Sequence, residues 1–320
     1  MDIEAEKARK FRISDFDLIR LLGTGARSSI WEGRDTSTGK SFAIKRTFKQ
    51  PEDDNRYLDQ AINEYEIASR LQHPTIRKVF SLKRVRRVFS IREIHTVMEL
   101  CLGKTLEEAP PNSLLEKCVV LIEVAKAVHE MNSKGYVHAD MKPDNIVVSE
   151  KGRVKIIDLG LSCPLGTVKQ RIQGTPSYMA PEQLVCWPLD ARTDVYNFGA
   201  TMYWALTGEL PPTVVPHQDN SISAHQKSAI PPHIVKPGIP LHLSYLVTDC
   251  IKIEPSGRLG GMDAVATRIL VIIRELERDQ EPTFRIRQRH GTGHGGSFLV
   301  SEYRSVAVSE RLGPERHVIR

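Results

Sequence analysis

Apolar and polar residues alternate over short distances in the first part of the chain, which is the pattern of β-strands. Residues 15–22 and 41–46 each predict a strand, and residues 79–100 predict two more. Residues 59–71 instead repeat apolar side chains with helical spacing, and Pro74 ends that pattern. The chain therefore begins with a small β-rich unit that contains one long helix.

Helical spacing dominates the chain after residue 100. The elements expected there are helices at 114–134, 194–206, 241–252 and 262–277, and short strands at 146–148 and 154–157. Residues 211–240 contain seven prolines and are expected to form a loop. From residue 278 the chain is polar, with eight Arg, no Lys and five acids, and is expected to be a flexible basic tail. The second unit should thus be larger and mostly helical.

The composition is that of an ordinary globular protein, with 40% hydrophobic and 26% charged residues among 320. The five cysteines are scattered without C-x-x-C pairs or metal-ligand spacing, which favours a reducing compartment. Residues 1–12 lack the apolar core of a signal peptide, and the most apolar stretch, residues 119–128, is interrupted by charges. We therefore expect a soluble, cytoplasmic protein.

The positive charge is concentrated in residues 77–92, which contain seven basic residues and no acid. The whole chain carries +6 and this segment +7, so the remainder carries −1. A solvated strand face is the simplest interpretation, and docking of an acidic protein, nucleic acid or phospholipid is the alternative. Phe80 and Phe89 are its only aromatic residues, so stacking on nucleic acid is weakly supported and an acidic partner is preferred.

Side chains that could take part in catalysis or ligand binding are concentrated in the middle of the chain. His138, Asp140, Lys142 and Asn145 fall within eight residues. A carboxylate can accept a proton, a lysine can balance phosphate charge, and an asparagine carbonyl can bind a hard cation. Asp158, at the end of a predicted strand, offers a second oxygen ligand. Phosphoryl transfer needs these groups, because it depends on positioning and charge stabilisation.

Two glycines, Gly23 and Gly25, follow the first predicted strand and let backbone N–H groups approach phosphate oxygens. A second strand follows them, whereas a dinucleotide-binding fold would place a helix there, so we expect a β-hairpin. An ordinary glycine turn is the alternative. Lys45, on a strand, and Glu64, on the helix, are expected to pair, with Glu66 as the rival partner.

In this order, the motifs resemble those of the eukaryotic-type serine/threonine protein kinase family over residues 15–277. The motifs are Gly23-Thr24-Gly25, Ala43-Ile44-Lys45, Glu64, His138-Ala139-Asp140, Asn145, Asp158-Leu159-Gly160 and Ala180-Pro181-Glu182. The resemblance implies an α+β, bilobal protein kinase fold. Its implied boundaries are an N-terminal extension at 1–14, a β-rich N-lobe at 15–98, a hinge at 99–103, a mostly helical C-lobe at 104–277 and a flexible tail at 278–320.

The resemblance also implies ATP and Mg²⁺ as cofactors and Ser/Thr hydroxyl groups of proteins as acceptors. It implies that Lys45 holds phosphates and is oriented by Glu64, and that Asp140 is the base. The implied catalytic residues are Asp140, Lys142 and Lys45, and the implied Mg²⁺ ligands are Asn145 and Asp158. The implied nucleotide contacts are Gly23, Thr24, Gly25, Ile30, Ala43, Lys45, Glu64, Met98, Glu99, Cys101 and Val147. Arg258 is the implied buried partner of Glu182.

Three positions depart from the family pattern. Ser28 replaces the third glycine, Leu159 replaces a phenylalanine, and Ala139 replaces the arginine that gathers an activation-loop phosphate. We therefore predict that activity does not strictly require phosphorylation within residues 161–175. A catalytically weak scaffold of kinase fold and a basic adaptor are the alternatives to an active enzyme.

Overall fold

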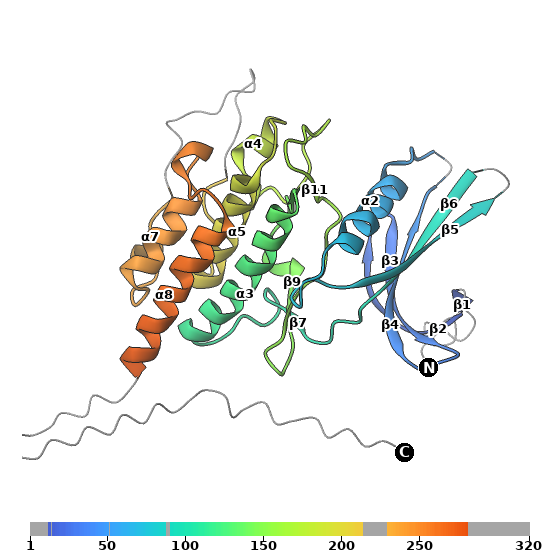
Figure 1. Cartoon of the computed structure of the whole chain (residues 1–320), viewed down its shortest axis with the longest axis horizontal. Helices are drawn as coiled ribbons and strands as arrows, with labels where there is room; N and C mark the ends of the chain where they lie inside the picture. Colours follow the sequence, from blue (N-terminus) through green and yellow to red (C-terminus); the bar gives the residue numbers. More distant parts are fainter. Residues whose placement is uncertain (1–11, 14, 51, 88–89, 214–228, 281–320) are drawn as a thin grey trace, which may run out of the picture. The chain divides into compact units, whose positions relative to one another are not determined.

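The computed structural model describes residues 12–13, 15–50, 52–87, 90–213 and 229–280 (Figure 1). The chain divides into a first unit at residues 1–281 and a second at residues 282–320. The second unit lies outside the described residues, as do most of the expected flexible tail and most of the expected N-terminal extension. All elements named below belong to the first unit.

The N-terminal sheet, as far as the described residues show it, has six antiparallel strands in the order β1-β2-β3-β4-β6-β5 (Figure 1). They are β1 (Arg12–Ile13), β2 (Phe16–Gly25), β3 (Ser28–Asp35), β4 (Ser41–Phe48), β5 (Val79–Arg87) and β6 (Ser90–Met98). Strand β1 lies within the expected extension, where Ile13 is buried and pairs with Phe16. The described sheet thus starts at residue 12, three residues before the predicted start of the N-lobe. The sequence does not predict β1, because two residues are too few to show an alternating pattern.

Helix α2 (Arg56–Arg70) packs against strands β4, β5 and β6. Its buried residues Leu58 and Ala61 meet Ile94 of β6. Ile67, farther along the helix, belongs instead to the main core of the C-terminal half. One helix is therefore shared between the two halves. It begins three residues before the predicted start, at Arg56.

The C-terminal half is mostly helical in the described part of the chain. Its long helices are α3 (Leu114–Ser133), α5 (Ala191–Thr207), α7 (Leu241–Cys250) and α8 (Met262–Gln280). Ser113 and Glu116 form a capping box at the start of α3, and Gly208 ends α5 with a left-handed φ of 84°. Helix α8 runs three residues into the expected tail.

Short elements connect these helices and carry most of the chemistry. They are β7 (Lys104–Thr105), β8 (Tyr136–Val137), η1 (Pro143–Asn145), β9 (Ile146–Val148), β10 (Val154–Ile156), β11 (Cys163–Pro164), α4 (Pro181–Leu184), α6 (Pro232–Val235) and η2 (Pro255–Gly257). Strands β10, β9 and β7 form one small sheet, and β11 and β8 form another. Within the described parts of the proline-rich stretch 211–240, α6 is the only helix or strand.

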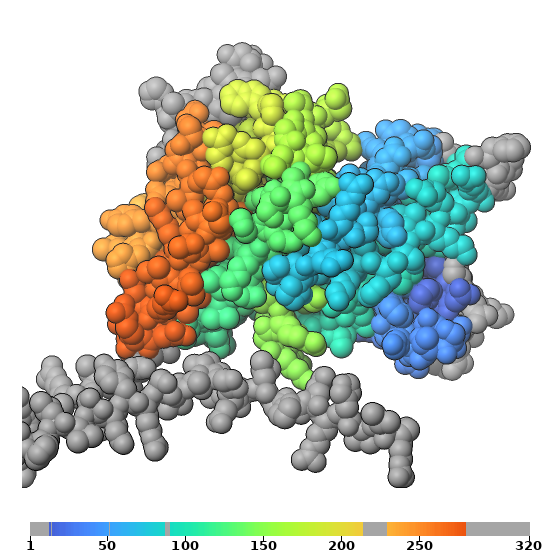
Figure 2. Space-filling model, viewed as in Figure 1, coloured from blue at the N-terminus to red at the C-terminus, as the bar shows by residue number. Residues whose placement is uncertain are grey.

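The two halves are joined by direct hydrogen bonds as well as by the chain. Ile76, just before β5, forms a parallel bridge with Ile156 of β10. The surface of α2 lies beside that of the α3–β8 region (Figure 2), where Arg70 Nη1 donates to the hydroxyl of Tyr136 at 2.7 Å. Helix α2 is therefore held by contacts with the N-terminal sheet and by contacts with the C-terminal half.

Long apolar helices of the kind that cross a membrane do not occur among the described residues.

Candidate active site

The backbone of the predicted catalytic loop is held by a buried carboxylate from α5. Asp194 accepts hydrogen bonds from the N–H groups of His138 and Ala139, both at 2.9 Å, and from Asn132 Nδ2 at 2.7 Å. Burial raises the pKa of Asp194 to about 6, although these hydrogen bonds oppose the shift. Ala139 has a left-handed φ of 61°, which the two bonds to Asp194 help to hold.

Asp140 lies at the centre of a polar cluster. Its Oδ1 accepts hydrogen bonds from the N–H and the hydroxyl of Thr175, both at 3.1 Å, and Lys142 Nζ lies 3.7 Å from its Oδ2. Lys142 Nζ also donates to Thr175 Oγ1 at 2.9 Å. Burial raises the pKa of Asp140, and Lys142 partly offsets the shift. A carboxylate placed between a hydroxyl and a lysine can orient and deprotonate an incoming alcohol.

Asn145 and Asp158 are brought near each other by the backbone, where the N–H of Ile157 donates to the carbonyl of Asn145 at 3.0 Å. The Asn145 amide nitrogen donates to the backbone carbonyl of Asp140 at 2.8 Å, so its own carbonyl oxygen can face a cation. Burial would raise the pKa of Asp158, but Lys45 and the N–H of Gly160, at 2.8 Å, lower it overall. Asp158 is thus an ionised oxygen donor, and the pair suits a hard cation such as Mg²⁺.

The pairing of Lys45 with Glu64 that the sequence predicts is present. Lys45 Nζ donates to Glu64 Oε2 at 2.6 Å, and both side chains are largely buried. Burial lowers the pKa of Lys45, but the charges of Glu64 and Asp158 outweigh it, so the pKa is raised overall. The lysine therefore remains a cation in the pocket that it lines together with Asp158.

The predicted glycines lie at the end of β2, just before the two-residue turn of the β2–β3 hairpin, and strand β3 rather than a helix follows them. Gly25 pairs with Ser28, and a Cβ added to Gly25 would lie 2.9 Å from Ser28 Oγ. A Cβ at Gly23 would meet nothing within 4 Å, so the backbone there borders open space. Thr24 lies between the two in β2. A pocket beneath the turn is lined in part by Ser28, Lys45 and Asp158.

The apolar residues predicted to surround the adenine come from several strands. Ala43 of β4 pairs with Met98 of β6, and both are buried. Ile30 of β3 is half-buried and pairs with Lys45. Val147 is a buried residue of β9, which belongs to the C-terminal half. The predicted adenine contacts therefore come from both halves of the molecule.

The segment after β6, residues 99–103, leads from the N-terminal sheet to β7 of the C-terminal half. The Glu99 carboxylate accepts hydrogen bonds from Lys155 Nζ at 2.7 Å and from the N–H of Lys78 at 3.1 Å. The half-buried Cys101 thiol donates to the carbonyl of Glu99 at 3.7 Å. Burial raises the pKa of Cys101 to about 11, so the thiol stays neutral.

His138 behaves as the buried hydrogen bonder that its position suggests. Its Nδ1 accepts a hydrogen bond from the N–H of Asp140 at 3.2 Å. Burial lowers the pKa of His138 to about 4, so the ring is neutral near pH 7. The ring is therefore a neutral hydrogen-bond acceptor that helps to hold the backbone of Asp140.

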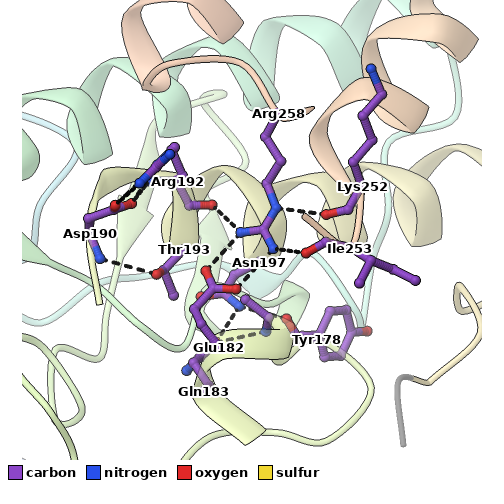
Figure 3. A network of polar contacts seen from close by, with 11 residues as sticks. Tyr178, Glu182, Gln183, Asp190, Arg192, Thr193, Asn197, Lys252, Ile253 and Arg258 are labelled. Carbon is purple, nitrogen blue, oxygen red and sulfur yellow. Dashed lines mark hydrogen bonds and ion pairs between the residues drawn. The ribbon is translucent and has the colours of Figure 1, made fainter. Parts of the chain in front are cut away.

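The predicted partner of Glu182 is also in place. Arg258 forms two parallel hydrogen bonds to Glu182, at 2.7 and 2.9 Å (Figure 3). Both side chains are buried, and Arg258 also donates to the carbonyl oxygens of Lys252, Ile253 and Arg192. Figure 3 shows this network joining α4 to the start of α5 and to the segment before α8.

Two residues of the site are not among those that the sequence predicts. Asp194 opens a helix with an apolar pattern, and an acid at the start of such a helix is a signal that it has buried partners. Arg77 belongs to the basic segment 77–92, for which a solvated face is the simplest interpretation, and this is wrong for Arg77, whose side chain is only 10% exposed. Its guanidinium lies 3.6 Å from Glu64 Oε1.

Comparison with known proteins agrees with this geometry. The family model for the protein kinase domain matches residues 16–270. A probable serine/threonine-protein kinase of Clostridium acetobutylicum, CA_C1728, is 25% identical over 83% of this chain and 41% of its own length. The serine/threonine-protein kinase PknA of Mycobacterium tuberculosis is 28% identical over 78% of this chain and 60% of its own. The probable serine/threonine-protein kinase PknB of Corynebacterium glutamicum is 30% identical over 63% of this chain and 33% of its own length.

Each match thus spans less than two thirds of the relative. The family model nevertheless covers most of this chain, and the fold is bilobal with an antiparallel sheet in one lobe and helices in the other. The chain belongs to the protein kinase family.

Proposed function

We propose that the protein transfers the γ-phosphoryl group of ATP to Ser or Thr hydroxyl groups of protein substrates. The observation that carries the proposal is the contact of Asp140 with Thr175 and Lys142, with Thr175 Oγ1 3.1 Å from Asp140 and 2.9 Å from Lys142 Nζ. In this arrangement Asp140 orients the acceptor hydroxyl and takes its proton. Lys142 stabilises the negative charge on the transferred group.

Members of the family use ATP and a divalent metal ion, and the oxygen donors of this chain fit Mg²⁺. We assign Asn145 and Asp158 as its ligands. A bound Mg²⁺ would neutralise part of the phosphate charge. Lys45 holds the phosphates, and Glu64 orients Lys45.

We assign the remaining nucleotide contacts to residues of both halves. We assign the phosphates to the loop Gly23-Thr24-Gly25 and the adenine to the apolar and hinge residues Ile30, Ala43, Met98, Glu99, Cys101 and Val147. The kinase domain is assigned to residues 15–277, together with strand β1, whose Ile13 is buried against the sheet.

Activity without an activation-loop phosphate is part of the proposal. Ala139 is buried in an apolar cluster with Val137, Cys163 and Leu189, so no cation stands at that position to bind a phosphate. The segment is held by other contacts: Lys169 Nζ donates to the carbonyl of Leu161 at 2.9 Å. These contacts support an ordered segment that does not rely on modification.

The test is transfer from labelled ATP with Mg²⁺ to a generic basic protein and to the chain itself. The wild type should label Ser and Thr, and Asp140→Asn and Lys45→Met should each abolish the signal, by about 10²-fold or more for the loss of the base. ATP binding without transfer above these variants would contradict the proposal and favour a scaffold of kinase fold.

A second proposal concerns an acidic protein partner for strand β5. Within the described residues this strand is the last in the sheet order, and its side chains Lys83, Arg84 and Arg86 are exposed. An acidic extended segment would meet the side of an edge strand and positive charge there. A poly-glutamate peptide should bind the wild type and weaken with salt, whereas a variant with all three residues changed to Gln should not bind. Equal binding by both proteins would refute it.

A further inference from the structure

Arg77 differs from the rest of the basic segment in its surroundings. Its side chain is 10% exposed, whereas the next residues with positive charge, Lys78, Lys83 and Arg84, are exposed. Arg77 precedes β5, at the point where the chain leaves α2 and approaches the C-terminal half. A buried arginine is stable only when its charge is compensated, so its partners indicate its role.

The partner of Arg77 is the carboxylate that also holds Lys45. Glu64 Oε1 lies 3.6 Å from Arg77 Nη2, and Glu64 Oε2 lies 2.6 Å from Lys45 Nζ. The two oxygens of one buried carboxylate thus face two different cations, and the Glu64 side chain is only 5% exposed. Removing either cation would leave the other as the main compensation for a buried negative charge.

The backbone of Arg77 is fixed to the strand that leads to Asp158. The N–H of Arg77 donates to the carbonyl of Ile156 at 2.9 Å, and the N–H of Ile156 donates to the carbonyl of Thr75 at 2.7 Å. Ile156 ends β10, two residues before Asp158. Arg77 therefore links α2, through Glu64, to the strand that leads to the proposed metal ligand Asp158.

The four charges of this group balance: Lys45 and Arg77 are positive, and Glu64 and Asp158 are negative. Lys45 is assigned to nucleotide phosphates while Glu64 orients it, so its charge would be shared between Glu64 and the phosphates when they arrive. With Lys45 as its only partner, Glu64 would then be left as a poorly compensated buried anion, and α2 would be free to shift. Arg77 supplies the second cation that prevents this.

We propose that Arg77 is a positioning residue of the transfer site, which holds Glu64 and α2 in place while Lys45 contacts both Glu64 and the nucleotide phosphates. This proposal rests on the proposed kinase activity for its kinetic consequence, but the position of α2 can be measured without activity. Arg77 itself touches neither the nucleotide nor the acceptor in this scheme.

The kinetic test compares wild type with Arg77→Met and Arg77→Lys in the labelled-ATP assay. Arg77→Met keeps an unbranched stem and removes the charge, and should lower kcat about tenfold, with KM for ATP changed less than about threefold. Arg77→Lys restores a cation near Glu64 and should recover most of the loss. An unchanged kcat in folded Arg77→Met, or no recovery with lysine, would overturn the proposal.

Arg46→Met is the matched control. Arg46 lies next to Lys45 on β4 and forms a partly buried ion pair with Glu93, at 2.7 Å from Arg46 Nε. Its partner Glu93 also contacts His95 at 2.9 Å and pairs with neither Lys45 nor Asp158 in the contacts described. This variant loses a partly buried ion pair in the sheet against which α2 packs, and it should keep its kcat. A loss equal to that of Arg77→Met would show a general effect of sheet stability and overturn the proposal.

Hydrogen exchange of the α2 amides gives the readout that does not depend on catalysis. With Mg²⁺ and ADP present, Arg77→Met should exchange residues 56–70 faster than wild type, and Arg46→Met should not. If the wild type transfers no phosphate but this difference is found, the proposed function fails and the role of Arg77 in positioning α2 stands. If the wild type is active and exchange in α2 is the same in all three proteins, the role of Arg77 fails alone.

Discussion

At the scale of single residues, His138 shows how burial fixes a protonation state. Its ring is 1% exposed, and burial lowers its pKa from 6.5 to about 4. A neutral ring can accept the N–H of Asp140, whereas a protonated ring cannot accept it at Nδ1. The geometry of the catalytic loop is therefore linked to pH through a residue that does no acid–base chemistry.

The first prediction concerns stability at acidic pH. Because the folded pKa of His138 is lower than the unfolded one, the unfolded state binds the extra proton as pH falls from 6.5 toward about 4. The free energy of unfolding should fall with it, by about 2 kcal/mol at pH 5 from this residue alone. Urea unfolding at pH 7 and pH 5 should show a smaller decrease for His138→Asn than for wild type. His242→Asn, which alters an exposed histidine, is the control and should follow the wild type.

The second prediction concerns Thr175, whose hydroxyl bridges Asp140 and Lys142. Thr175→Val keeps the backbone N–H bond but loses both hydroxyl contacts, and should lower kcat about tenfold. Thr175→Ser should retain activity, and Thr167→Ala, outside this cluster, should be neutral in the same assay. If Thr175→Glu restored the activity lost in Thr175→Val, the hydroxyl would be acting through phosphorylation and the assignment would be wrong.

At the scale of elements, the Arg258–Glu182 pair fixes a four-residue helix that would not be stable alone. We predict that Arg258→Met destabilises the fold by about 3–5 kcal/mol, because it leaves the Glu182 charge buried without a partner. The double variant with Glu182→Met should be less destabilised than the sum of the single variants. Chemical unfolding of all four proteins measures this coupling, and strict additivity would contradict it.

The sequence predicts the helices and strands better than the contacts between them. Helices such as α3 have long apolar faces and clear caps, so their existence and bounds follow from spacing. Lys45, Glu64 and Asp140 were found because their motifs have fixed order. Arg77 was not, because the strand pattern around it does not show which element of the other half will cover it. The burial of such a residue is a property of the tertiary structure.

At the scale of the whole molecule, the unit at residues 1–281 contains the core of the fold, the active-site cluster and the links between the halves. We predict that a chain shortened to residues 1–281 keeps its melting temperature within about 2 °C, since no described contact is removed. It should also keep phosphate transfer to a basic protein. A large loss of stability, measured by thermal unfolding, would show that residues 282–320 contribute to the fold.

The bridge between Ile76 and Ile156 also limits how the two lobes can move. The chain joins them through residues 99–103, and the hydrogen bonds of Ile156 to Thr75 and Arg77 form a second link through the backbone. Side chains of α2 add further links, from Arg70 to the hydroxyl of Tyr136 and from Asn63 to the carbonyl of Ser162. A rotation about the line through the two backbone links would disturb those links least, and it would have to break or carry along the side-chain contacts of α2. Opening for nucleotide exchange is therefore expected to be a hinge motion about a single axis, with β10 moving little relative to the residues before β5.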